Sequence, residues 1–299
     1  MQRKKFIYSI LGLTAMANLS VLQQLSDTLR EEDEKYPVLF VGHGSPMNAI
    51  EDNEFTERWK AMAKEIARPK AVLCISAHWL TQGTKVTAMD APKTIHDFGG
   101  FPKELFAVEY PAPGNATLAK ETKEMIKSTT TTLDHDWGLD HGTWSVVKQM
   151  YPDADIPVLQ LSIDYSRDAQ YHYNLGKELA ALRKKGVLII GSGNMVHNLG
   201  MLGFPKDVKP QDRDFNAEYG YDWALEMKDI FRKKIEDKDH KSLIDYKNLS
   251  KSAILAIPTP DHYYPLMYAL ALQDEKETVS FFNDKAVAGA ITMTSLKIG

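Results

Sequence analysis

The sequence contains a single cysteine, Cys74, among its 299 residues. This excludes an internal disulfide bond, and it also excludes a thiolate metal cluster built from this chain alone. A metal site in this protein must therefore use nitrogen and oxygen ligands. Cys74 itself lies in an apolar run, where we expect it to be a small buried hydrophobic residue rather than a nucleophile.

An excess of charge of one sign and long hydrophobic runs are also missing. Lysine and arginine number 36 against 40 aspartate and glutamate residues, which gives a formal net charge of −4. Because this slightly acidic balance comes without long basic runs, we expect no nucleic-acid partner. The apolar stretch near the N-terminus is interrupted by Tyr8, Ser9 and Gly12 and is too weak to span a bilayer, so we expect no membrane span.

Two interpretations of the N-terminal segment remain open. Its basic residues, its short apolar stretch and Ala15-Met16-Ala17 are similar to a secretory signal with a small-residue cleavage site. The alternative is an amphipathic helix that caps the domain. We expect residues 1–36 to be an extension that ends in a charged linker over residues 25–36. The protein is then expected to be cytoplasmic, or periplasmic if the segment is a cleaved signal.

Apolar runs alternate with helical patterns from residue 37 to the C-terminus. Strands are predicted at residues 37–42, 71–77, 156–163, 186–191 and 253–257, with a C-terminal pair near 278–282 and 286–297. Helices are predicted at residues 53–66, 115–128, 168–185, 214–235 and 264–272. Strands separated by helices indicate an α/β fold, and continuous apolar strands indicate a mainly parallel sheet that is covered on both faces. We therefore expect residues 37–299 to form one domain, with helices flanking a central sheet.

Histidines follow four of the apolar runs, each in a turn rich in glycine or proline: His43, His78, His197 and His262. Taken alone, each is better explained as a buried histidine that is satisfied by the backbone. Their shared placement changes this interpretation, because the carboxyl edge of a parallel sheet is where ligands bind. Four imidazoles brought to one edge favour a mononuclear metal site with nitrogen ligands.

Two further segments carry histidines of interest. Asp140 and His141 stand between two tryptophans, an arrangement that suits either a pocket for a flat substrate or core packing. Residues 85–115 are rich in proline and glycine and too long for a simple connection, which predicts a binding loop carrying His96 and Asp97. The remaining histidines are expected at the surface: His135, His172 and His240.

Eight motifs occur in order along the chain: GHGSPMNAIEDN, SAHW, TIHDFGGFP, YPAPG, DHGTW, MYPDADIPVLQLSID, GSGNMVHN and PTPDHYYPL. Together they resemble the DOPA-type extradiol ring-cleavage dioxygenases of the LigB superfamily, from about residue 37 to the C-terminus. The resemblance implies a single α/β domain with a metal at the carboxyl edge of the sheet. It implies metal ligands at His43, His78 and His262, an acid/base residue or fourth metal ligand at His197, and a substrate-pocket histidine at His141.

The same resemblance implies an oxidoreductase that inserts both atoms of O2 into a catechol ring, DOPA-like, to give a muconic semialdehyde. His197 and His141 would be its catalytic residues, and His96, Asp97 and His141 would contact the substrate. One divalent metal per chain is implied. The LigB-type site resembles a triad of two histidines and one carboxylate, whereas the third position here is His262. Three neutral imidazoles suit Zn(II) at least as well as iron, but Fe(II) is expected for catalysis because zinc has no redox capacity.

Two other classes of function remain open. A zinc-dependent hydrolase would need the metal but no oxygen, and a non-catalytic metal-binding protein of the Memo type would bind the metal without turning over a catechol. Three competing signatures are absent from the sequence: the Gly-x-Ser-x-Gly elbow, the phosphate-binding loop with its lysine, and the His-Glu-x-x-His helix. For a dioxygenase, the expected partners are a small-molecule catechol and O2, bound by a monomer or a homodimer.

Overall fold

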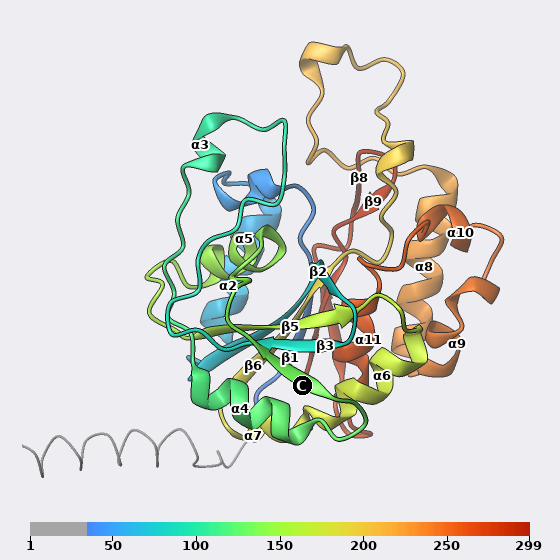
Figure 1. Ribbon diagram of the computed structural model, residues 1–299. Coiled ribbons are helices and arrows are strands. Elements are labelled where there is room, and N and C mark those ends of the chain that lie inside the picture. The colour runs from blue at the N-terminus through green and yellow to red at the C-terminus, as the bar shows by residue number, and fades with distance from the viewer. Residues whose placement is uncertain (1–34) are drawn as a thin grey trace, which may run out of the picture.

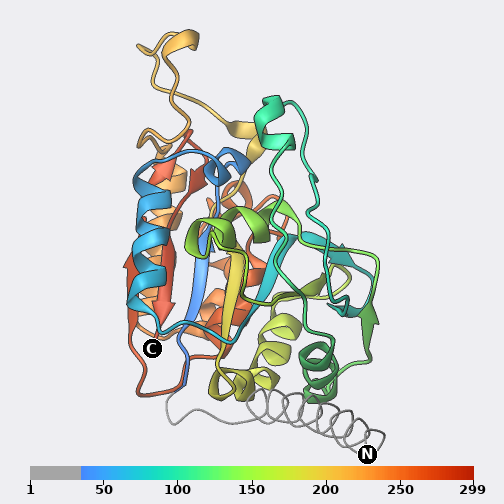
Figure 2. The ribbon, with the colours of Figure 1, turned by 90° about the vertical axis from the view of Figure 1, so that its left-hand side faces the viewer.

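The centre of the fold is an eight-stranded sheet, seen with its flanking helices in Figure 1 and Figure 2. The computed structural model describes residues 35–299, so the predicted extension over residues 1–36 lies almost entirely outside the described residues. The strand order is β4-β3-β5-β2-β6-β1-β10-β7. This arrangement confirms the predicted α/β class.

The middle of the sheet is parallel, as the apolar runs predict. Its four strands are β5 (Val158–Asp164), β2 (Ala71–Thr81), β6 (Val187–Gly193) and β1 (Val38–Gly42). On the β1 side the sheet is extended by two antiparallel strands, β10 (Ser295–Ile298) and β7 (Val279–Phe282). On the β5 side it is extended by β3 (Thr84–Thr87) and β4 (Thr131–Asp134).

Helices cover both faces of the sheet, and every residue of β1, β5 and β6 is buried. Successive residues of β1 enter different cores, because side chains alternate across a strand: Val38 and Phe40 pack on one side, Leu39 and Val41 on the other. One face carries α2 (Glu54–Glu65) and α5 (His141–Met150). The opposite face carries α4 (Ala116–Met125), α6 (Ala169–Glu178), α8 (Asp222–Glu236) and α11 (Tyr264–Ala271).

Short elements complete the described part of the chain, residues 35–299. The remaining helices are α3 (Lys103–Phe106), α7 (Ala180–Lys184), α9 (His240–Ile244) and α10 (Ala253–Ala256). Single 3₁₀ turns occur at η1 (Pro46–Ala49), η2 (Leu199–Met201), η3 (Pro210–Asp212) and η4 (Tyr246–Asn248). A separate antiparallel pair consists of β8 (Ala286–Val287) and β9 (Ile291–Thr292). Within residues 35–299, no helix combines the length and the apolar character that crossing a membrane requires.

The predicted strand at residues 253–257 is wrong, because this segment forms the helix α10. Ala253 and Ala256 are buried while Ile254 is 70% exposed, which is the burial spacing of a helix rather than of a strand. An apolar run this short does not distinguish the two by itself. His262 therefore follows a helix and a turn, not a strand.

Several predicted boundaries also differ from the structure. The predicted helix at 168–185 divides at Leu179 into α6 and α7, and the one at 214–235 begins only at Asp222. The predicted strand at 286–297 is broken into β8, β9 and β10, since Ala288 and Gly289 have φ values of 46° and 75° and form a turn. The prediction also missed β3, β4 and α5.

Four single-residue predictions can be compared with the structure. His135 is exposed, as expected, whereas His240 is only partly exposed. Cys74 is fully buried, as expected, and burial raises the pKa of its thiol far above the ordinary value, so it remains protonated. His172 is not at the surface, contrary to the prediction. It is fully buried on α6, where its Nδ1 pairs with the hydroxyl of Tyr268 at 2.9 Å and burial lowers its pKa to about 4.

Candidate metal centre

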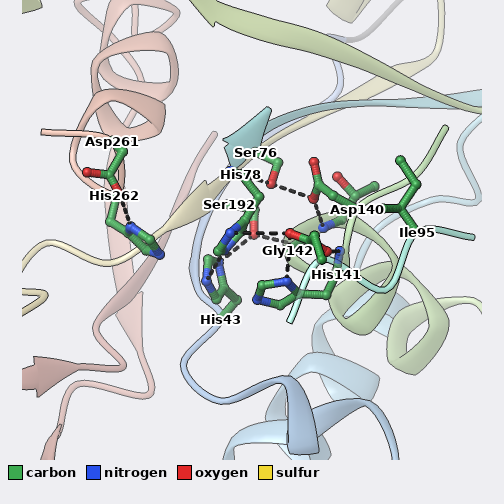
Figure 3. Close-up of polar contacts among 12 residues, drawn as sticks. His43, Ser76, His78, Ile95, Asp140, His141, Gly142, Ser192, Asp261 and His262 are labelled. Atoms are coloured by element: carbon green, nitrogen blue, oxygen red, sulfur yellow. Dashed lines mark hydrogen bonds and ion pairs between the residues drawn. The ribbon is translucent and has the colours of Figure 1, made fainter. Parts of the chain in front are cut away.

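Three histidine side chains meet at the carboxyl edge of the parallel strands (Figure 3). His43 follows β1 directly, His78 lies near the end of β2, and His262 stands shortly before α11. One ring nitrogen of each lies within 4.8 Å of the other two, and the Nε2 atoms of His43 and His78 are 3.2 Å apart. Two nitrogens held at ~2.0–2.1 Å by one tetrahedral ion lie about 3.3 Å apart, so this pair has the spacing that a shared ion requires.

Local backbone features orient these three rings toward one another. The pairing of β2 with β5 shifts register between Ile75 and Leu80, an irregularity that often redirects a side chain beside a site. At the end of β6, a Cβ atom on Gly193 would lie only 2.2 Å from the carbonyl oxygen of His262. That carbonyl accepts a hydrogen bond from the backbone of Asn194 at 3.0 Å. Glycine is therefore needed at position 193 for the His262 segment to dock against β6.

The hydrogen bonds around His43 determine which of its nitrogens is free. The hydroxyl of Ser192 donates to the carbonyl oxygen of Gly142 at 2.6 Å. Its oxygen must then accept from Nδ1 of His43, which lies 3.0 Å away. Nδ1 therefore carries the proton, and Nε2 keeps its lone pair on the side that faces His78.

Carboxylates contact the Nδ1 atoms of the other two rings, those of His262 and His78. Asp261 accepts a hydrogen bond from Nδ1 of His262, which leaves Nε2 of that ring free. Burial opposes ionisation of Asp261, but the contacts with His262 and Thr259 hold the pKa of its carboxyl well below the ordinary value. Oδ2 of Asp97 lies 3.5 Å from Nδ1 of His78. Such partners fix the tautomer and orientation of metal-binding histidines.

The protonation states also suit a metal. Burial, followed by the neighbouring imidazoles, lowers the pKa of both His43 and His78 well below the ordinary value. Both rings are then neutral, which is the form that binds metals. Two imidazole nitrogens only 3.2 Å apart are stabilised by a cation between them. The set His43, His78 and His262 therefore fits a divalent ion that accepts nitrogen ligands, such as zinc or iron.

His197 lies against His262. The two rings are stacked, with centroids 3.5 Å apart and an angle of 9° between their planes. Burial, and then the neighbouring His262, lowers the pKa of His197 to about 3, so its imidazole is neutral at pH 7. His197 forms a second close set with Asp261 and His262, but it is not part of the set made with His43 and His78.

His141, the first residue of α5, lies beside His78 together with Asp97. Its ring centroid is 3.9 Å from that of His78. Its backbone N–H donates to Oδ1 of Asp97 at 2.9 Å. Its Nδ1 lies 3.0 Å from Oδ2 of the same carboxylate, a close ion-pair contact without the alignment of a hydrogen bond. Burial opposes ionisation of Asp97, but His141 more than offsets it and holds the pKa of that carboxyl below its ordinary value.

A cavity of about 570 Å³ opens above these side chains, a volume typical of small-molecule sites. Its polar lining consists of the five histidines just described together with Asp97 and Ser45. The rest of the wall is mostly apolar: Met47, Phe98, Phe101, Leu199, Leu202, Phe215 and Ile291. The arrangement is thus a buried nitrogen-rich centre at the base of an apolar pocket.

Comparison with known families accounts for this combination. A model described as the catalytic LigB subunit of aromatic ring-opening dioxygenase matches residues 37–294. The chain belongs to the LigB family. As a member of that family, the protein is an oxidoreductase of the ring-cleaving dioxygenase class.

Individual LigB relatives match almost the whole chain. The "4,5-DOPA dioxygenase extradiol" of Escherichia coli (strain K12) is 42% identical, over 89% of this chain and 95% of that protein. The protein with the same description from Beta vulgaris is 35% identical, over 89% and 97%. A crystal structure of an uncharacterized protein from Escherichia coli K12 superposes with a TM-score of 0.73 at 37% identity, over 89% of this chain and all of that one. These similarities confirm the LigB-like fold.

The structure separates the residues that the sequence nominated for this LigB site. It brings together His43, His78, His262, His197, His141 and Asp97 around one cavity. His96, nominated for substrate contact, is not among the residues that line the cavity. Its Nε2 pairs with the carbonyl oxygen of Val108 at 2.9 Å, and its ring packs against Phe98 and Trp144.

Other residues of the site were missed. Ser192 lies in the motif GSGN, but the sequence does not indicate that it contacts His43. That contact depends on the strand register, which places Ser192 beside Val41. Gly142 lies within DHGTW, where no sequence signal indicates that its carbonyl accepts from Ser192. Leu199, Leu202 and Phe215 come from a long connection between β6 and α8, where no periodicity distinguishes a cavity wall.

A buried network connects α5 to the strand that carries His78. Asp140 caps α5 and is fully buried, and burial raises the pKa of its carboxyl. The carboxylate accepts hydrogen bonds from the hydroxyl of Ser76 and the amide of Gln160, both at 2.6 Å. Ser76 in turn accepts from the backbone N–H of His78 at 3.2 Å. The network therefore holds the start of α5 close against His78.

Replacing Gly142 with alanine tests this close packing. The added Cβ atom would lie 2.6 Å from Oγ of Ser76 and 2.8 Å from Cδ2 of His78, so one of them must move. We expect a loss of about 10–100-fold in affinity for a divalent metal, as for other outer-sphere changes, measured by competition with a chelating dye. Gly99→Ala is the matched control, because no atom lies within 4 Å of a Cβ atom there. Equal metal affinity in the two variants would contradict the packing argument.

Proposed function

We propose that the protein is a metal-dependent extradiol dioxygenase that inserts both atoms of O2 into the ring of a catechol and forms a muconic semialdehyde. The observation that carries the proposal is the convergence of His43, His78 and His262 at the base of an aromatic-lined cavity. The two relatives described as 4,5-DOPA dioxygenase extradiol support it. The catalytic domain would be residues 37–299.

His43, His78 and His262 would hold one divalent ion through their Nε2 atoms. When bound, iron(II) supplies the redox chemistry with dioxygen, which zinc does not provide. Ser192, Asp97 and Asp261 orient the three rings from behind. Because these partners fix the rings before a ligand arrives, the site is preorganised.

His197 would be the general acid and base. Its neutral imidazole lines the cavity and is held by stacking on His262 and by a backbone hydrogen bond to the carbonyl of Ala256 at 2.9 Å. It can take the proton from a catechol hydroxyl oxygen and return it to the ring-opened product. Such help typically contributes ~10²–10⁴-fold to the rate.

His141 would position the substrate. Asp97 holds the Nδ1 side of its ring, so Nε2 is the nitrogen available to the cavity. That nitrogen accepts a substrate hydroxyl proton when the ring is neutral, and donates to a developing negative charge when the ring is protonated. The aromatic rings of Phe98 and Phe101 face the same cavity and suit a flat substrate.

One comparison of metals and gases tests the proposal. Metal-free protein is loaded with either Fe(II) or Zn(II), mixed with a catechol, and followed by oxygen uptake and by absorbance of the yellow ring-opened product. We expect turnover only with Fe(II) and only in the presence of O2. Zinc-supported turnover without oxygen would indicate the hydrolase instead. Metal binding without turnover of any catechol would indicate a non-catalytic metal-binding protein.

A further inference from the structure

The outer walls of the cavity are apolar on both sides. Phe98 and Phe101 come from the loop before α3, while Leu199, Leu202 and Phe215 come from the connection between β6 and α8. In Figure 1 and Figure 2 these two loops project beyond the sheet in the same direction. A substituent on a ring bound at the histidines would therefore extend between two hydrophobic walls.

Charged groups that could pair with a substrate substituent are missing from this lining. Within residues 35–299, no lysine or arginine lines the cavity, and Asp97 is the one acidic residue that does. Asp97 is already engaged by His141 and His78. Arg213, on the same connection as Phe215, is directed onto the ring of Phe204, with its guanidinium carbon 5.1 Å from the ring centroid.

Asn216, the polar residue next to Phe215, also has a hydrogen-bond partner within the protein. The amide of Asn216 donates to a carboxylate oxygen of Glu51 at 3.2 Å, which connects this loop to the segment after η1. Ser45, the hydroxyl in the lining, accepts a hydrogen bond from the backbone N–H of Met47. Arg213 and Asn216 thus have partners within the protein, and Ser45 offers a substituent only a neutral hydroxyl.

From these contacts we infer that the enzyme prefers catechols whose substituent is uncharged and apolar, an alkyl or aryl group, over catechols that carry an amino-acid side chain. The inference rests on the proposed function and concerns the substrate class of the same cavity. DOPA, for which two of the relatives are named, carries both an ammonium and a carboxylate. Moving either charge against these walls removes water and provides no free partner of opposite charge, whereas an alkyl group gains from leaving water.

A matched series of four catechols isolates this preference. Propylcatechol, dopamine, dihydroxyphenylpropanoate and DOPA share the ring and a three-atom side-chain backbone, and they differ in the charged groups on it: neutral, cationic, anionic and zwitterionic. We expect kcat/KM, measured by oxygen uptake with the Fe(II) enzyme, to be at least about tenfold higher for propylcatechol than for DOPA. A kcat/KM for DOPA equal to or above that of propylcatechol would overturn the inference and leave the dioxygenase assignment intact.

Binding provides a readout that does not depend on turnover. Titration calorimetry of the same four catechols into Zn(II)-loaded protein compares their affinities without oxygen chemistry. We expect propylcatechol to bind at least about tenfold more tightly than DOPA. If no catechol is cleaved with any metal, the proposed function fails, and the calorimetric order still decides for or against an apolar pocket.

A charge added to the wall should shift the preference in a defined direction. We expect Leu202→Arg to raise kcat/KM for dihydroxyphenylpropanoate relative to propylcatechol by about tenfold, because the guanidinium supplies the missing partner. Leu225→Arg is the control, since Leu225 has nearly the same exposure, 37% against 38% for Leu202, but does not line the cavity. An equal ratio in both variants would show that the substituent does not contact this wall.

Discussion

The His43→Ala variant is expected to lose catechol cleavage and to bind a divalent metal at least ~100-fold more weakly than the wild type. Its Nε2 lies 3.2 Å from that of His78, and its Nδ1 is committed to Ser192. Alanine therefore removes one of the three nitrogens that converge on the proposed ion. Even outer-sphere partners of metal ligands are typically worth 10–100-fold in affinity, so a ligand itself should cost more. Competition with a chelating dye, together with metal content after dialysis, measures the loss.

His135→Ala is the matched control for His43→Ala, because it also removes one imidazole but from an exposed position after β4. Circular dichroism and a urea unfolding curve for both variants separate loss of the metal from loss of the fold. The Ser192→Ala variant should fall between the control and His43→Ala, since it frees the His43 ring without removing it. If His43→Ala kept the affinity of His135→Ala, the proposed ligand set would be wrong.

The parallel core could be predicted from the sequence because its strands are buried on both faces. The runs at 37–42, 71–77 and 186–191 lack polar alternation, and the structure confirms them as β1, β2 and β6. The short strands β3 and β4 could not be recognised in this way, since each has only four residues and β4 lies at the edge of the sheet. The position of β3 depends on its pairing with β5, and that of β4 on its pairing with β3, rather than on a local pattern.

The convergence of the histidines was predictable only in part. His43 and His78 are carried by neighbours of β6 in the sheet, so the rule about carboxyl edges brings them together. His262 arrives differently, after α10 and a turn, and reaches the same place because Gly193 leaves room for its backbone. The strand predicted before His262 is wrong, although the His262 side chain lies at the predicted edge of the sheet.

The supporting residues and the cavity wall could not be obtained from the sequence, because they depend on docking between distant segments. Gly142 and Ser192 are 50 residues apart in the chain. The carbonyl of Gly142 reaches the hydroxyl of Ser192 only when α5 is packed on the sheet. Leu202 and Phe215 reach the cavity through an irregular connection, where a hydrophobic residue does not reveal which surface it faces. Periodicity carries no such information outside helices and strands.

The second large effect is expected for His197→Gln, which should lower kcat by about 10²–10⁴-fold while leaving metal affinity within a few-fold of the wild type. Glutamine keeps a hydrogen-bonding group in the cavity but cannot take and return a proton at neutral pH. The stacking of His197 on His262, and its absence from the set formed with His43 and His78, favour the acid/base role over that of a fourth ligand. Single-substrate kinetics with propylcatechol and a chelator competition measure the two quantities separately.

His240→Gln serves as the control for His197→Gln. His240 is a partly buried imidazole that pairs with Tyr173 and Gln273, and it does not line the cavity, so its replacement should leave kcat within a few-fold of the wild type. The two roles open to His197 then predict different patterns. An acid/base residue gives a loss in kcat alone, because the three remaining imidazoles still hold the metal. A fourth ligand gives a parallel loss of metal affinity, and that result would remove His197 from the proton-transfer step and place it in the coordination sphere.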